Sequence, residues 1–206
     1  MSIPSTETHT PRVVEVRIHG RGGQGNVVAA YLLAAAAIRD GHFAQAFPAF
    51  GAERRGAPVA AFVRIADRTL RRRSQVRMPR WLIVQDAALL DVPGVLDGLH
   101  PEGGVLANSR ESSDALSARL KVNAVALPAG HMAREVLGRP VPNTALLAAF
   151  AALTDLYSLD ALEEEIRNRF GDKGADVVER NLELVRRAAG AVPAGQWKEA
   201  AHGTGA

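Results

Sequence analysis

The sequence predicts an α/β fold: a mostly parallel sheet flanked by helices, with a helical C-terminal end. Two patterns carry this prediction. Short runs rich in Val and Ile alternate with Ala- and Leu-rich stretches over the first two thirds of the chain, and helical patterns dominate the rest. The chain has 206 residues, 47% of them hydrophobic, and can bury one large core. No internal repeat or linker divides it.

The N-terminal unit combines a strand, a glycine-rich loop and a helix. Residues 13–18 have the β-branched composition and the alternation of a strand. Residues 26–39 form the predicted helix, with Asn26 near its start and Gly41 as a fitting stop. This order is typical of the first unit of a Rossmann-like sheet.

The remaining elements follow from the same periodicities. We predict further strands at residues 42–47, 59–65, 81–84, 104–108 and 122–127. We predict further helices at residues 115–120, 131–137, 144–153, 159–170 and 175–189. These elements form one domain over residues 13–190, between a flexible arm at 1–12 and a flexible tail at 191–206.

The composition excludes several classes of function. Without cysteine, this chain can hold no disulfide, thiolate nucleophile, or cysteine-ligated zinc or iron–sulfur cluster. A net charge of +3 and 5% aromatic residues do not suit nucleic-acid binding. The longest nearly unbroken apolar run, residues 27–38, is too short for a bilayer, and no secretory signal is seen. We therefore expect a cytoplasmic location with no nucleic-acid or membrane partner.

The sequence carries no signature of independent catalysis. Its six histidines lack metal-ligand spacing, and it has neither a P-loop nor a Gly-x-Ser-x-Gly nucleophile elbow. We assign no catalytic residue and no metal ligand. Any catalytic function is expected to be completed by other chains.

The clearest local signal is the glycine loop, defined as Gly20, Arg21, Gly22, Gly23, Gln24 and Gly25. Its Gly-x-Gly-x-x-Gly pattern allows positive φ and close approach of a ligand, and the helix that follows offers free N–H groups to a phosphate. NAD binding would also need an acid about 20 residues on. Asp40 precedes the second strand and Glu53 follows it. Three alternatives therefore remain beside NAD: a bare turn, another phosphate-bearing ligand, or a partner subunit.

A second candidate segment is the arginine loop, which lies between two predicted strands and contains Gly51, Glu53, Arg55 and Gly56. If the sheet is parallel, this loop lies at the same edge as the glycine loop, where ligands bind in open α/β sheets. An arginine there can bind a phosphate or carboxylate bidentately. The alternative is an exposed loop with a local Glu53–Arg ion pair.

Together these motifs resemble the gamma subunit of the 2-oxoacid:acceptor oxidoreductases. The resemblance rests on the glycine loop, on Phe50-Gly51-x-Glu53-x-Arg55-Gly56, and on a strand that ends near Asp67. Asn143 stands where that family has an Asn opening a helix. Two residues depart from the family pattern: Phe50 replaces a Tyr, and Ala57 replaces a Gly.

The resemblance implies oxidative decarboxylation of a 2-oxoacid, such as pyruvate or the aromatic phenylglyoxylate, to an acyl-coenzyme A. It implies that thiamine diphosphate, Mg and iron–sulfur clusters lie on alpha, beta and ferredoxin-like delta subunits. An NAD-reducing relative adds a flavin subunit with FAD and NAD. The glycine loop, the arginine loop and Asn143 are then expected at the coenzyme A site or a subunit interface, and this chain alone binds no cofactor.

Two other interpretations stay open. One is a free-standing Rossmann-type nucleotide-binding protein or NAD-dependent enzyme. It would require an acid at the end of the second strand and a proton-transfer residue in the crevice, and neither is evident. The other is the small subunit of indolepyruvate oxidoreductase, which shares this domain.

Overall fold

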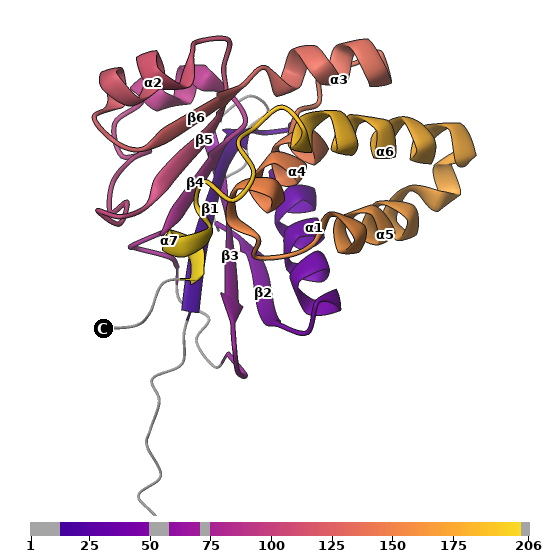
Figure 1. Cartoon of the computed structure of the whole chain (residues 1–206), viewed down its shortest axis with the longest axis horizontal. Coiled ribbons are helices and arrows are strands. Elements are labelled where there is room, and N and C mark those ends of the chain that lie inside the picture. Colours follow the sequence, from indigo (N-terminus) through magenta and orange to yellow (C-terminus); the bar gives the residue numbers. More distant parts are fainter. Residues whose placement is uncertain (1–12, 50–57, 71–74, 203–206) are drawn as a thin grey trace, which may run out of the picture.

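The computed structural model describes residues 13–49, 58–70 and 75–202 (Figure 1). Their centre is a six-stranded sheet with the order β2-β3-β1-β4-β5-β6. The strands are β1 (Val13–Arg21), β2 (Phe43–Pro48), β3 (Pro58–Ala66), β4 (Trp81–Val84), β5 (Gly104–Asn108) and β6 (Ala124–Leu127). The predicted arm at residues 1–12 lies outside the described residues.

The sheet is mixed, with a single reversed strand. β1, β4, β5 and β6 pair in parallel, whereas β3 is antiparallel to both of its neighbours, β1 and β2. The α/β prediction is confirmed, and the sheet is mostly parallel in strand direction. β3 is reversed because only nine residues, 49–57, separate it from β2, whereas a parallel return of the chain needs a crossover of about a dozen residues or more.

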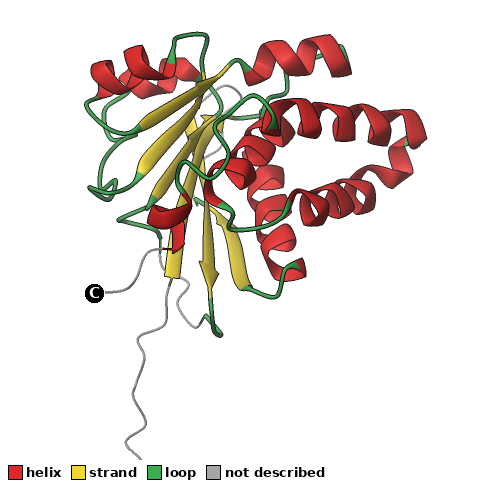
Figure 2. Ribbon diagram, viewed as in Figure 1, coloured by secondary structure: helices red, strands yellow, loops and turns green. Residues whose placement is uncertain are grey.

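Helices cover both faces of the sheet (Figure 2). The helices are α1 (Asn26–Arg39), α2 (Ser113–Leu120), α3 (Ala129–Leu137), α4 (Asn143–Thr154), α5 (Leu159–Phe170), α6 (Ala175–Ala189) and α7 (Lys198–His202), with short 3₁₀ turns η1 (Ala87–Asp91) and η2 (Gly171–Lys173). The larger core joins the sheet to α1, α3, α4, α5, α6 and α7, while η1 and α2 pack on the opposite face. None of the helices within the described ranges is long and apolar enough to cross a membrane.

Helix α4 is the centre of the larger layer, since eleven of its twelve residues are buried. Its Ala- and Leu-rich sequence has no polar face, as expected for a helix that is surrounded by other elements. The sheet lies on one side of it, and α5, α6 and α7 pack around the others.

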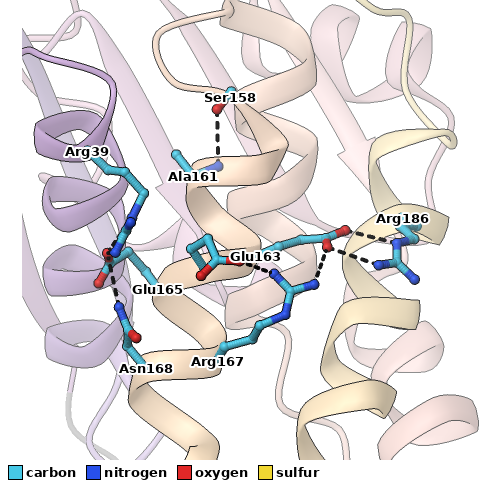
Figure 3. A network of polar contacts seen from close by, with 9 residues as sticks. Arg39, Ser158, Ala161, Glu163, Glu165, Arg167, Asn168 and Arg186 are labelled. Atoms are coloured by element: carbon cyan, nitrogen blue, oxygen red, sulfur yellow. Dashed lines mark hydrogen bonds and ion pairs between the residues drawn. The ribbon is translucent and has the colours of Figure 1, made fainter.

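Ion pairs tie α5 to two of its neighbouring helices, α1 and α6 (Figure 3). The carboxylate of Glu163, which is 9% exposed, accepts hydrogen bonds from Arg186 on α6 (2.9 Å) and from Arg167 on α5 itself (3.0 Å). On the other side, Glu165 pairs with Arg39 of α1 at 2.7 Å. Because Glu163 is mostly withdrawn from water, breaking its ion pairs should cost more unfolding free energy than breaking the exposed ones.

The C-terminal segment differs from the expected flexible tail. Trp197 is 1% exposed and stacks on Trp81 of β4, with ring centroids 4.7 Å apart. The backbone N–H groups of Gly195 and Trp197 donate to the carbonyls of Ala152 and Leu153 on α4, each at 2.8 Å. The Gly- and Ala-rich composition suggested a loose end, but one buried tryptophan anchors the segment through residue 202. Residues 203–206 lie outside the described part.

Candidate functional site

The candidate site lies at the carboxyl edge of the four parallel strands. After β1 the chain crosses through α1 to β2 on one side, while β4 lies on the other side of β1. Such a reversal of strand order leaves a crevice beyond the carboxyl ends of the two strands, where α/β proteins bind ligands. The glycine loop begins with the last two residues of β1 and therefore sits at this point.

The glycine loop is a tight turn closed by Gln24. The Gln24 backbone N–H donates to the carbonyl of Arg21 at 3.0 Å, and the Gln24 side-chain Oε1 accepts from the N–H of Arg21 at 2.7 Å. Gly23 has φ +91° and Gly25 has φ +80°, conformations that side chains disfavour. The Gln24 Nε2 group has no partner among the described residues, so it can donate to a ligand or another chain.

Asn26 holds the loop to the sheet. Its Oδ1 accepts from Gln85 Nε2 at 2.6 Å, and its Nδ2 donates to the Val59 carbonyl at 3.0 Å. A Cβ placed on Gly20 would clash with the Asn26 side chain, which explains the glycine at this position. These contacts join β1, β3 and β4 through one amide, so the loop has a fixed position.

Arg21 and Asp86 form an ion pair across the switch point, at 2.5 Å. Asp86 also caps η1 by accepting from the N–H of Ala88 at 3.0 Å. The Asp86 carboxylate therefore pairs with the one arginine of the glycine loop.

Asn143 stands beside the glycine loop. It begins α4 and is 7% exposed. A Cβ placed on Gly25 would lie 3.0 Å from its Nδ2, so the two residues are in close contact. Its neighbour Thr144 lies 3.4 Å from Asn181 of α6, which links the site to the C-terminal helices. The structure thus brings Gly20–Gly25 and Asn143 together.

The arginine-loop residues of the prediction, Gly51, Glu53, Arg55 and Gly56, lie outside the described residues. The strands on either side of this loop are described. Pro58 of β3 pairs with Arg21, and Pro48 of β2 pairs with Ala61 of β3. Both strand ends that flank the loop therefore lie at the edge of the sheet that carries the glycine loop. The role of the four residues stays a prediction.

Comparison with known families then identifies the chain. The model of the family described as pyruvate ferredoxin/flavodoxin oxidoreductase matches residues 15–191. The chain belongs to this family.

Similar proteins confirm the gamma-subunit prediction. Pyruvate synthase subunit PorC of Methanothermobacter thermautotrophicus is 47% identical over 176 residues, which cover 85% of this chain and 94% of the relative. The pyruvate/ketoisovalerate oxidoreductases common subunit gamma of Pyrococcus furiosus is 42% identical over 179 residues, covering 85% and 95%. The crystal structure of pyruvate oxidoreductase subunit PORC from Thermotoga maritima superposes with a TM-score of 0.76 at 33% identity, covering 86% and 96%.

The topology of the gamma subunit accounts for its incomplete NAD signature. In a dinucleotide-binding sheet, an acid at the end of the second strand binds the ribose beside the glycine loop. Here the antiparallel β3 lies between β1 and β2, and β2 contains no acid. The strand end that would carry this acid is therefore displaced by one strand from the loop.

Several polar residues of this edge were missed by sequence reasoning. Gln85 and Asp86 follow β4 directly, and Asn108 ends β5. Asn108 donates to the Gln85 carbonyl at 3.0 Å and accepts from the Gly130 N–H at 2.9 Å. A polar residue at the end of a buried parallel strand is the signal that could have found them.

His19, the residue before Gly20, is buried on the sheet face opposite α1. Burial, together with the nearby charge of Arg17, lowers its pKa from 6.5 to about 4. Arg17 is itself anchored to the carbonyls of Val95 and Asp97, at 2.9 and 2.8 Å. His19 is therefore a neutral core residue at neutral pH rather than a proton donor.

Proposed function

We propose that this gamma subunit works in a pyruvate or 2-oxoacid:ferredoxin oxidoreductase whose other subunits carry thiamine diphosphate and iron–sulfur clusters, and that its carboxyl edge helps to bind coenzyme A. The absence of cysteine supports the placement of the clusters on partner subunits. The family description supports ferredoxin or flavodoxin, rather than NAD, as the electron acceptor.

The choice of 2-oxoacid is proposed to lie with the partner subunits. The name of the Pyrococcus furiosus relative describes a gamma subunit common to pyruvate and ketoisovalerate oxidoreductases. A subunit shared in this way does not select between those two substrates. Pyruvate is nevertheless the substrate named for the Methanothermobacter thermautotrophicus relative, and we propose it here over phenylglyoxylate.

The observation that carries the coenzyme A proposal is the pair of side-chain amides at the glycine loop. Gln24 belongs to the loop, Asn143 lies close to Gly25 of the loop, and the N-terminus of α1 has no side-chain cap. Uncapped N–H groups and side-chain amides can hydrogen-bond the amide groups of this coenzyme. Such a site adds binding and orientation, while the redox chemistry belongs to the cofactors of the partners.

The test uses the assembled complex, with Gln24→Ala as the variant and Gln196→Ala, an exposed glutamine of the C-terminal segment, as the matched control. We expect Gln24→Ala to raise the KM for coenzyme A about tenfold, as for a lost hydrogen bond plus a loosened turn, and to leave the KM for the 2-oxoacid unchanged. An unchanged KM for coenzyme A would refute the role of the loop. Initial rates with ferredoxin and with NAD as acceptors decide the acceptor.

A further inference from the structure

A cavity of about 310 Å³ lies beyond β5 and β6, at the same edge of the sheet as the glycine loop. Asn108, Ser109 and Arg110 line it from the end of β5. Gly130, His131 and Arg134 line it from α3, which follows β6. Its position beyond two parallel strands is one where α/β folds bind ligands.

The cavity has two arginines without a partner. Within the described part of the chain, the guanidinium groups of Arg110 and Arg134 make no hydrogen bond or ion pair, and no Asp or Glu lines the cavity. The nearby Arg119, by contrast, is bound to Glu111 at 2.8 Å. His131 also lines the cavity, and its Nδ1 lies 3.2 Å from Glu135. Two such guanidinium groups on one cavity suit a phosphate, which each can bind through two parallel hydrogen bonds.

The glycine loop offers a different chemistry. Its one cation, Arg21, already pairs with Asp86. The carboxylate of Asp86 would repel a phosphate placed beside it. Gln24 and Asn143 supply neutral amides instead, which suit a ligand that carries amides of its own.

The residues that follow β4 connect the two sites. Ala87 lines the cavity and follows Asp86 in the chain. Asn108, on the cavity wall, is hydrogen-bonded to the Gln85 carbonyl. β1 and β6 are three strand positions apart, so the loop and α3 are separated by about 14 Å along the edge of the sheet. A long ligand with a charged end and an amide-bearing arm can reach both.

We propose that the Arg110–Arg134 cavity binds the phosphate-bearing nucleotide end of coenzyme A, and that the glycine loop contacts its amide-bearing pantetheine arm. This assignment rests on the proposed function, and it specifies which end of the coenzyme lies at each of the two sites. It reverses the expectation from the Gly-x-Gly-x-x-Gly pattern, which would place a phosphate on the loop.

The experiment is calorimetric titration of the assembled complex with coenzyme A and, separately, with pantetheine, which lacks the phosphates. We expect Arg110→Ala and Arg134→Ala each to weaken coenzyme A binding about tenfold and to leave pantetheine binding unchanged. Gln24→Ala should weaken both ligands. Arg169→Ala, an exposed arginine of α5 that lines a different pocket, is the control and should change neither.

The outcomes separate the two proposals. If both arginine variants bind coenzyme A normally while Gln24→Ala binds it weakly, the cavity assignment is wrong and the proposed function stands. If none of the three variants weakens it, both are wrong. Wild-type complex provides a measurement without mutation: inorganic pyrophosphate should compete with coenzyme A but not with pantetheine. Competition with both ligands would overturn the assignment.

Discussion

Trp81 and Trp197 stack nearly parallel, at an interplanar angle of 14°, and so join the central strand β4 to the last turn before α7. Both rings are buried, and Phe150 of α4 meets Trp81 edge-on with centroids 6.3 Å apart. A segment more than a hundred residues away in the chain thereby completes the core beneath the sheet. The first prediction follows from this contact.

Replacing Trp197 with Ala should lower the free energy of unfolding by about 3 kcal/mol, since a large buried ring is lost and a cavity is left. Urea titration of the full chain measures the change. Gln196→Ala, next to it and exposed, should stay within about 0.5 kcal/mol of the wild type. A Trp197→Ala variant as stable as wild type would show that the C-terminal segment is not part of the cooperative core.

Two glycines with similar backbone conformations allow the cost of backbone strain to be distinguished from the cost of side-chain crowding. Gly25 has φ +80° with Asn143 close by, whereas Gly138 has φ +73° and nothing within 4 Å of a placed Cβ. Gly138→Ala should cost about 1 kcal/mol from the left-handed backbone alone. Gly25→Ala should cost more, because Asn143 must also move. Equal losses in thermal denaturation would show that the Asn143 contact does not constrain the loop.

Acid should destabilise the protein through His19. Its folded-state pKa, about 4, lies below the ordinary 6.5, so the unfolded chain binds the proton more tightly. Stability contributed by neutral His19 is therefore complete above pH 6.5 and falls as the pH drops toward 4, by about 3 kcal/mol at most. His19→Gln should flatten this part of the stability–pH curve. An unchanged slope between pH 6.5 and 4 would contradict the buried, neutral imidazole.

Glu163 should be the most costly of the α5 carboxylates to neutralise. Glu163→Gln removes the charge that Arg167 and Arg186 share, and we expect a loss of about 2 kcal/mol of unfolding free energy. Glu164→Gln is the matched control, because Glu164 is exposed and pairs only with Arg167 among the described residues. Chemical denaturation at low and high salt distinguishes the two, and equal losses would refute the special position of Glu163.

Local elements were predictable because their signals are local. The predicted helix at 26–39 and the strands at 81–84 and 104–108 match α1, β4 and β5 to the residue. The predicted helices at 159–170 and 175–189 likewise match α5 and α6, and each other predicted element differs at one or both ends by one to three residues. The strand at 13–18 continues to Arg21, and the helix at 115–120 begins at Ser113 after the Ser112 cap. The short α7 and η1 were not predicted, because a few residues carry too little periodicity.

The candidate site could be predicted only in part. The glycine loop is one contiguous motif, and Asn143 came from the family resemblance rather than from spacing. The pairing of Arg21 with Asp86 joins positions 65 residues apart, and no periodicity connects them. Likewise, Arg110 and Arg134 share a cavity only because β5 and β6 are neighbours in the sheet.

The sequence by itself determined the α/β class, the strand–glycine loop–helix unit, the absence of cysteine chemistry and the family, because composition and short motifs carry that information without folding. Only the tertiary structure decided that β3 is reversed and inserted beside β1, that Trp197 anchors the C-terminal segment, and that Asp86 forms an ion pair with Arg21. These features depend on strand order and on contacts between distant residues. They appear when the buried faces of the sheet and helices are packed together.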